Sequence, residues 1–181
     1  MFSALNPAKS MKLTLAILCL VVPVLSFGHE LEQAAAEKAL IAQHHDRVNR
    51  GDWRAATLDY SEDTKNHGRT VGRAGLQRVY DDIFTTFPDW RMEIVDLAVM
   101  DDAVIVRCKV SGTHRGVGKL PINGAMLIDV PPTGKHFEVQ HIHWYKLRDG
   151  KIVDHYANRD DIGMMRQLGL LPPAPLPVAA K

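Results

Sequence analysis

The spacing of apolar residues changes about halfway along the chain. Between residues 72 and 86 they recur every three or four positions, the repeat of an amphipathic helix. From Trp90 onwards apolar and polar residues alternate, as in strands with one buried face. Helices that precede a run of antiparallel strands predict an α+β fold, with the helices on one face of a curved sheet. The expected helices cover 30–50, 53–60, 72–86 and 161–168, and the expected strands cover 90–99, 103–110, 136–147 and 151–158.

Turn-forming residues separate these elements. Gly51 suits the end of the first helix, and Asp52 can cap the second one. Pro88 is expected to end the third helix. Asp149-Gly150 is a strong signal for a two-residue hairpin between the last two strands.

Two segments lack any regular period. Residues 61–68 are polar and are expected to form a loop. Residues 111–135 are rich in Gly and Pro, and loops of this length usually form a lid or a pocket rim. A loose insertion is the alternative for the second segment, although its apolar stretch 125–128 favours packing on the core or over a pocket.

The N-terminus is predicted to be a targeting segment outside the fold. Lys12 precedes a short apolar run that ends at Phe27, which is typical of a secretory signal peptide. We expect residues 1–28 to be removed by cleavage near Gly28, and the protein to be exported to the periplasm or the medium. A retained membrane anchor is the alternative, but the run is shorter than the ~20 residues that a spanning helix needs. One domain over 29–171 and a Pro-rich tail over 172–181 would follow.

Composition excludes several classes of protein. The hydrophobic fraction is 46% and the charged fraction is 24%, as in ordinary globular domains. The formal net charge of +1 gives no support for a nucleic-acid surface or a polybasic membrane patch. Once Cys19 is removed with the leader, Cys108 is the one remaining cysteine, and its alternating apolar surroundings predict a buried small hydrophobe.

Several short motifs follow one another in a recognisable order: Asn49-Arg50-Gly51-Asp52, Gly112-Thr113-His114, Pro132-Thr133-Gly134-Lys135, Asp149-Gly150-Lys151-Ile152-Val153 and the segment 160–169. Together they resemble the SnoaL-like polyketide cyclase (ester cyclase) family of the NTF2-like superfamily, over about residues 38–170. The resemblance implies a cone-shaped, curved antiparallel sheet packed against N-terminal helices, with a short C-terminal helix. It also implies aldol-type cyclisation of a polyketide or β-keto ester, with no metal and no organic cofactor.

The resemblance places the catalytic carboxylate of the family on Asp160. A carboxylate in an apolar pocket has a raised pKa and can take a proton next to a carbonyl, then return it to the new alkoxide. The alternative is that Asp160 or Asp161 caps the helix that follows, and we expect capping mainly from Asp161.

Histidines on the predicted strands are candidates for binding the substrate. His141 and His143 share one strand face, and we expect them to line the cavity with Asn158 and Asp160. An exposed or purely structural role is the alternative for either histidine.

Further substrate-binding candidates come from the loops. The resemblance brings His67 and His114 to the pocket, where they would orient the carboxylate or bind a carbonyl oxygen. Trp90 would supply apolar wall for a flat substrate, although aromatic residues of this kind more often form plain core.

The family departs from this chain at three points. Asp154 and Tyr156 stand where the family often has Glu and Trp, and the segment between His114 and Pro131 is longer than usual. The identity of the substrate is therefore not carried over from the family.

Other functions stay open. His141 and His143, with His114 or His155, could hold Zn or Fe. An epoxide-hydrolase-like site would need Arg159 between two aspartates. A non-catalytic pocket could bind a small hydrophobic ligand. We expect a homodimer, because the outer face of such a sheet usually packs on a partner.

Overall fold

A computed structural model describes residues 7–122 and 125–173 of the chain. The helices are α1 (Pro7–Asn49), α2 (Trp53–Ala56), the 3-10 helix η1 (Thr57–Asp59), α3 (Gly72–Thr86) and α4 (Asp161–Gln167). The strands are β1 (Tyr60–Asn66), β2 (Arg69–Thr70), β3 (Arg91–Met100), β4 (Ala103–Thr113), β5 (His136–Arg148) and β6 (Lys151–Arg159). The tail over 174–181 lies outside the described residues.

The chain divides into two compact units, residues 1–36 and 37–181. The expected signal peptide lies in the first unit, where α1 begins, and its cleavage stays a prediction. Within the described ranges no helix combines the length and the apolar character that crossing a membrane requires.

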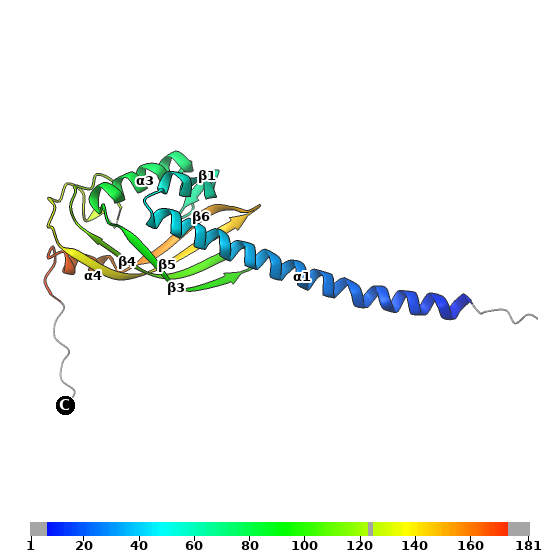
Figure 1. The fold of residues 1–181 in the computed structure, drawn as a ribbon. Helices are drawn as coiled ribbons and strands as arrows, with labels where there is room; N and C mark the ends of the chain where they lie inside the picture. The colour runs from blue at the N-terminus through cyan, green and yellow to red at the C-terminus, as the bar shows by residue number, and fades with distance from the viewer. Residues whose placement is uncertain (1–6, 123–124, 174–181) are drawn as a thin grey trace, which may run out of the picture. The chain divides into compact units, whose positions relative to one another are not determined.

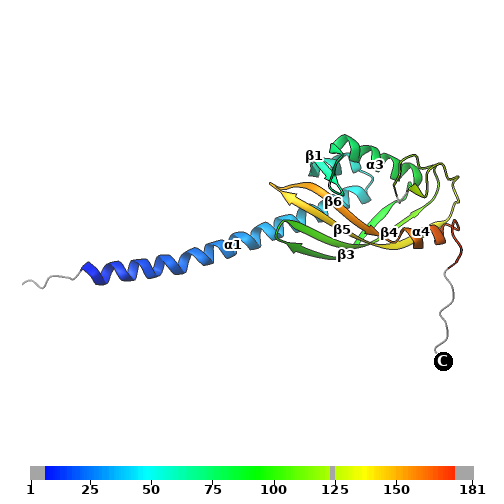
Figure 2. The same ribbon diagram turned by 180° about the vertical axis from the view of Figure 1, so that it is seen from behind.

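The second unit contains the predicted α+β domain. Figure 1 shows α3 over one face of a curved sheet, and Figure 2 shows the same arrangement from behind. The strand order is β2-β1-β6-β5-β4-β3. The fold prediction is confirmed, with one difference: β1 pairs with β6 in parallel, so the sheet is mixed.

The predicted loop over 61–68 is wrong for most of its length, because residues 60–66 form β1. This strand lies near the edge of the sheet and buries only Tyr60 and Thr64. Its remaining side chains reach solvent and can be polar. An edge strand of this kind carries little hydrophobic signal in the sequence.

The predicted helix signals near α2 and α3 are confirmed. Gly51 has a φ of +77°, the left-handed conformation of a helix C-terminus. The Asp52 side chain accepts a hydrogen bond from the backbone N–H of Ala55 at 3.3 Å. Helix α3 ends at Thr86, two residues before Pro88, as expected.

The core of the domain lies along β4. Val104, Val106, Cys108 and Val110 alternate along this strand and are fully buried. The prediction for Cys108 is confirmed: burial raises the pKa of its thiol to about 12, so it behaves as a small apolar side chain.

The β5–β6 hairpin contains an irregularity that sets the faces of both strands. Asp149 and Gly150 have φ values of 52° and 67° and form the predicted two-residue turn. Leu147 pairs with Ile152, but the next pair is Lys146 with Asp154, so Val153 is an extra residue in β6. This β-bulge shifts the register of every pair beyond it by one residue.

The long segment after β4 is anchored to the end of α3. The N–H groups of Arg115 and Gly116 both donate to the carbonyl oxygen of Thr86, at 3.0 and 3.1 Å. Gly116 allows this approach, because a Cβ on it would lie 1.9 Å from the carbonyl oxygen of Thr85.

Candidate functional site

A cavity of about 600 Å³ lies between α3 and the concave side of the sheet. Apolar side chains at or next to α3 and β3 and in the long loop form about half of its wall: Val71, Leu76, Val79, Ile83, Trp90, Met92, Leu120, Pro121 and Ile122. The expectation that the segment 111–135 contributes a pocket rim is confirmed, because Leu120, Pro121 and Ile122 belong to this wall.

Polar side chains from β1, β2, β5 and β6 and the turn between β1 and β2, together with Tyr80 of α3, line the rest of the cavity. They comprise tyrosines, histidines, arginines and one asparagine: Tyr60, Asn66, His67, Arg69, Tyr80, His141, His143, Tyr145, His155 and Arg159. Among the described residues of the wall there is no Asp and no Glu. The site therefore offers imidazole, phenol and guanidinium groups to a ligand.

The bulge at Val153 decides which residues of β6 reach the cavity. Directly opposite residues of two paired strands lie on the same face. His141 pairs with Arg159 and His143 pairs with Ala157, so β6 presents its odd-numbered side chains to the cavity. Asn158 lies on the other face and is exposed.

The expectation for Asn158 is therefore corrected. A two-residue turn at 149–150 with no bulge would have placed Asn158 opposite His141. Because of the extra residue, Arg159 lies opposite His141 in place of Asn158. The sequence carries no recognisable signal for this bulge, so Arg159 was missed as a cavity residue.

Two histidines and an asparagine form a hydrogen-bonded chain along the cavity wall. Nδ1 of His155 lies 3.0 Å from Oδ1 of Asn66, and Nε2 of His155 lies 2.8 Å from Nδ1 of His143. Because an amide oxygen only accepts, Nδ1 of His155 carries the proton and its Nε2 accepts from His143. The remaining nitrogen of His143, Nε2, then holds a free lone pair, and no protein group in the described chain bonds to it.

These histidines are neutral at physiological pH. Burial, with a smaller effect of neighbouring histidines and Arg159, lowers the pKa of His155 to about 3 and that of His143 well below 6.5. Burial and Arg159 also lower the pKa of His141 to about 4, against an opposing effect of Asp160. Neutral imidazoles can accept hydrogen bonds or protons, which imidazolium groups cannot.

The structure places four of the expected residues in the cavity wall: His67, Trp90, His141 and His143. His67 is exposed at the rim, between β1 and β2. Its backbone N–H donates to the backbone carbonyl oxygen of His155 at 2.8 Å. Trp90 is 7% exposed. Their roles in binding stay predictions.

His114 does not reach the cavity, contrary to expectation. It is fully buried beside Phe87, with ring centroids 5.7 Å apart. Its Nδ1 lies 3.3 Å from the N–H of Thr133, so it closes the base of the long loop. A histidine in a Gly-Thr-His turn gives no sequence signal that separates this structural role from ligand binding.

The helix cap falls on Asp160, whereas the sequence had suggested Asp161 for that role. Asp160 is exposed, and its Oδ1 accepts from the N–H of Gly163 at 2.7 Å, so it is the cap of α4. Asp161 is partly buried, and its Oδ2 lies 3.5 Å from Nε of Arg159. Burial raises the pKa of Asp161, with a further rise from Asp160 and an opposing effect of Arg159. Neither carboxylate belongs to the cavity wall.

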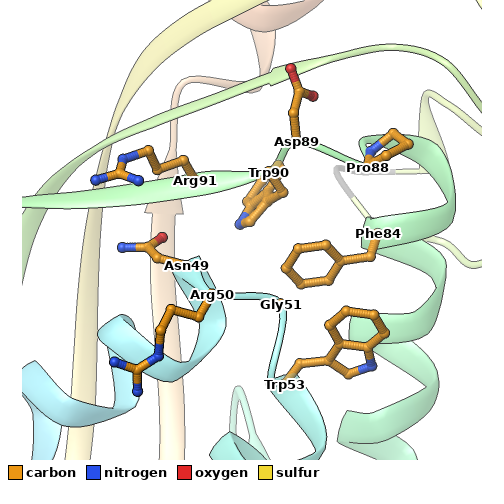
Figure 3. Close-up of a pocket in the computed structure, with 9 residues that line it drawn as sticks. All are labelled: Asn49, Arg50, Gly51, Trp53, Phe84, Pro88, Asp89, Trp90 and Arg91. Atoms are coloured by element: carbon orange, nitrogen blue, oxygen red, sulfur yellow. The ribbon is translucent and has the colours of Figure 1, made fainter.

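A second pocket of about 400 Å³ is lined in part by Trp90 (Figure 3). Its wall includes Asn49, Arg50 and Arg91. The rings of Trp53 and Phe84, which also line it, stack on each other at a centroid distance of 4.3 Å (Figure 3). Trp90 therefore lines both this pocket and the main cavity.

The histidines do not converge as metal ligands. Over residues 7–122 and 125–173 no group of three or more His, Cys, Asp or Glu side chains is arranged to hold a metal ion. His143 and His155 instead use their facing nitrogens to bond each other.

Comparison with known sequences extends over most of this domain. The sequence model of the SnoaL-like polyketide cyclase family matches residues 39–168. DnrD, the aklanonic acid methyl ester cyclase of Streptomyces peucetius, is 39% identical over 70 residues, which make up 39% of this chain and 43% of that protein. DauD, an enzyme of the same name from Streptomyces sp. strain C5, is also 39% identical over 70 residues. The chain thus matches less than half of the length of these curated relatives.

Solved structures show the same fold. IdmH of Streptomyces antibioticus, for which a polyketide cyclase activity is proposed, is 28% identical with a TM-score of 0.60, over 74% of this chain and 98% of that one. AclR of Streptomyces galilaeus, for which a hydroxylase activity is proposed, is 25% identical with a TM-score of 0.65, over 77% of this chain and 99% of that one.

Proposed function

The chain belongs to the SnoaL-like polyketide cyclase family, and on this premise we propose that it closes a ring in a polyketide or β-keto ester by an intramolecular aldol-type condensation that uses no organic cofactor. The observation that carries this proposal is the cavity of about 600 Å³, which joins an apolar wall to a row of neutral imidazoles and a guanidinium. The apolar wall suits a flat carbon skeleton. The polar wall suits its carbonyl oxygens.

Arg159 is the proposed donor to the enolate oxygen. Its guanidinium is always charged and carries several N–H donors, which stabilise negative charge as it develops on a carbonyl oxygen. Its side chain is 28% exposed and lies in the cavity wall, and its Nε lies 3.5 Å from Oδ2 of Asp161.

His143 is proposed to hold the enol hydroxyl of the substrate. The hydrogen bonds through His155 and Asn66 place the proton of His143 on Nδ1. Its Nε2 therefore has a free lone pair. An acceptor at this place favours the enol form of a 1,3-dicarbonyl compound over an isolated ketone, because the enol has an O–H to donate.

Asp160 is proposed as an acid/base group, because the resemblance implies it and because it lies close enough to His141 to affect the pKa of that imidazole. Its exposed position and its hydrogen bond to Gly163 support the competing role of a helix cap. Asn caps helices about as well as Asp, whereas Ala does not. Asp160→Asn therefore removes the charge and keeps the cap.

The test is a product assay with aklanonic acid methyl ester, the compound in the names of the matched relatives, and with a panel of simpler β-keto esters. We expect ring-closed product from the wild type and a loss of activity in Arg159→Lys and His143→Phe. Loss of activity in Asp160→Asn would support the carboxylate as acid/base. If Asp160→Asn equals the wild type, Asp160 only caps the helix. No ring-closed product from any compound would contradict the cyclase proposal.

A non-catalytic pocket for a small hydrophobic ligand is the second candidate. The absence of a carboxylate from the described cavity wall favours it. It predicts that Asp160→Asn and Arg159→Lys bind an apolar dye as tightly as the wild type does, and that none of these proteins turns over any β-keto ester.

We also propose that the protein is a homodimer joined through the outer face of the sheet. Ile142, Trp144 and Tyr156 lie there, 47%, 39% and 36% exposed, and Trp144 pairs directly with Tyr156. Apolar groups gathered in this way favour association. Light scattering after gel filtration should give twice the chain mass for the wild type and the chain mass for Trp144→Glu. A monomeric wild type would contradict the proposal.

Export is the remaining proposal. It is supported by the sequence of residues 1–28 alone. Mass spectrometry of protein from the periplasm or the medium should give a mature chain that begins near residue 29. Full-length protein found only in the cytoplasm would contradict it.

A further inference from the structure

A second chain of hydrogen bonds reaches the cavity from the side opposite β5. It starts at Asp59 of η1, passes through His44 of α1 and ends at Tyr80 of α3. Oδ2 of Asp59 lies 3.1 Å from Nδ1 of His44, and Nε2 of His44 lies 3.1 Å from the hydroxyl of Tyr80. His44 and Asp59 are buried, whereas Tyr80 is half-buried and belongs to the cavity wall.

The contacts of His44 fix the position of its proton. Nδ1 faces two oxygens, Oδ2 of Asp59 and the carbonyl oxygen of Ala56 at 3.2 Å. A carbonyl oxygen only accepts, so Nδ1 carries the proton. In the neutral ring Nε2 is then an acceptor, and the hydroxyl of Tyr80 donates its proton to it.

Asp59 remains ionised despite its burial. Burial opposes its charge, but hydrogen bonds from His44 and Arg47 outweigh that effect and lower its pKa. The Arg47 contact measures 2.5 Å between Nη1 and Oδ1. A carboxylate at this place stabilises a positive charge on His44, as the carboxylate does in other Asp–His pairs.

We propose that Tyr80, in place of Asp160, is the catalytic proton-transfer residue of the cavity, and that His44 and Asp59 are the residues that activate it; this rests on the cyclase function proposed above, and Asp160 then only caps α4. The bond between hydrogen and the α-carbon of the substrate breaks, and Tyr80 Oη takes that proton while passing its own to Nε2 of His44. The products of this step are an enolate, a neutral Tyr80 and an imidazolium paired with Asp59. After the new carbon–carbon bond forms, the proton returns by the same path to the alkoxide, so no other reactant is consumed.

The protein contains a second tyrosine–histidine pair, which resembles Tyr80 and His44 but has no carboxylate on the histidine. Tyr145 also belongs to the cavity wall, and its hydroxyl lies 3.0 Å from Nε2 of His45. Within the described residues no carboxylate bonds to the other nitrogen of His45. Burial, with a smaller effect of His44, lowers the pKa of His45 to about 3, so a proton passed to it would not be held. Tyr145→Phe is therefore the control for Tyr80→Phe.

The first measurement is hydrogen–deuterium exchange at the α-carbon of aklanonic acid methyl ester and of a simple β-keto ester in D2O, followed by mass spectrometry and corrected for the buffer rate. It detects proton removal whether or not a ring forms. Tyr80→Phe should lower the enzymatic rate about 100-fold, the scale of a lost acid/base group. Asp59→Asn should lower it about 10-fold or more, and Tyr145→Phe should lower it at least about tenfold less than Tyr80→Phe does, because His45 has no carboxylate partner.

The second measurement needs no substrate. ¹⁵N NMR of the histidine rings should show His44 protonated at Nδ1, with an Nε2 resonance that shifts in Tyr80→Phe and not in Tyr145→Phe. Retained dye binding and an unchanged melting curve in Tyr80→Phe would show that the cavity is intact.

The outcomes separate the two proposals. Exchange that depends on Tyr80, without a ring-closed product, would support the relay and contradict the cyclase function. Ring closure at the wild-type rate in Tyr80→Phe would overturn the relay and leave the cyclase function standing. A His44 protonated at Nε2, or no enzymatic exchange by the wild type with either compound, would also overturn the relay.

Discussion

Nδ1 of His143 lies 2.8 Å from Nε2 of His155, and this bond joins two strands at the polar wall of the cavity. Since Asn66 accepts from the far side of His155, the direction of every hydrogen bond in the chain is fixed. Both rings stay neutral because burial lowers their pKa values. The wall of the site is thus organised by groups on three separate elements.

Replacing Asn66 by Asp should place a negative charge at one end of the hydrogen-bonded chain that joins Asn66, His155 and His143. A carboxylate within hydrogen-bond distance favours an imidazolium, so the pKa of His155 should rise from about 3 by ~1–3 units. Histidine titration by NMR measures the change. The control is Asn158→Asp on the exposed face of β6, the strand of His155, which should leave the pKa of His155 within about half a unit of the wild-type value. An unchanged His155 in Asn66→Asp would contradict the hydrogen-bonded chain.

Stability should fall as the pH is lowered from 6.5 towards 4. Burial lowers the pKa of His45 and His155 to about 3 and that of His141 to about 4, against 6.5 for an unperturbed histidine. In this window the unfolded chain binds protons that the native protein does not. The stability gained from each neutral histidine is complete above pH 6.5 and decreases by about 1.4 kcal/mol per pH unit below it.

Urea unfolding at pH 7, 6 and 5 measures this dependence. His141→Gln removes one of the titrating groups, so its free energy of unfolding should depend less steeply on pH than that of the wild type. A free energy of unfolding that is constant over these three values would show that the histidines are not buried in neutral form.

A charge on the loop rim should block the cavity. Ile122 belongs to the cavity wall, whereas Ile128 in the same segment is 37% exposed and does not. Ile122→Asp should weaken binding of the apolar dye 1-anilinonaphthalene-8-sulfonate about tenfold or more, because it places a carboxylate against the ligand. Ile128→Asp should bind as the wild type does. Equal weakening in both variants would show that the loop acts only through general stability.

Gly116 should be the most sensitive glycine of the long loop. A Cβ here would lie 1.9 Å from the carbonyl oxygen of Thr85, so Gly116→Ala must displace the loop from α3. We expect a loss of about 2–4 kcal/mol in the free energy of unfolding. In Gly134→Ala the new Cβ meets no atom within 4 Å, and the only strain comes from the backbone φ of +68°. We therefore expect a smaller loss of about 1–2 kcal/mol in the free energy of unfolding. Denaturant unfolding compares the two, and an equal cost would contradict the anchoring of the loop.

The sequence by itself determined the elements with a strong local pattern. The apolar repeat of α3, the Asp149-Gly150 turn and the cap at Asp52 are encoded within a few residues, and each was found. The order of several short motifs also indicated the family, because members of a family share such motifs in their sequences. Strand β1 was missed, since an edge strand that buries two side chains has no clear period.

Only the tertiary structure decided which chemical groups face the cavity. One extra residue, Val153, reverses the faces of β6 beyond it. Arg159 and His155 therefore reach the cavity, while Asn158 does not. The chain from Asp59 through His44 to Tyr80 joins residues up to 36 positions apart, and no local pattern predicts it. A bulge and a long-range hydrogen bond depend on how whole elements pack, and that information is spread over the chain instead of lying in any single motif.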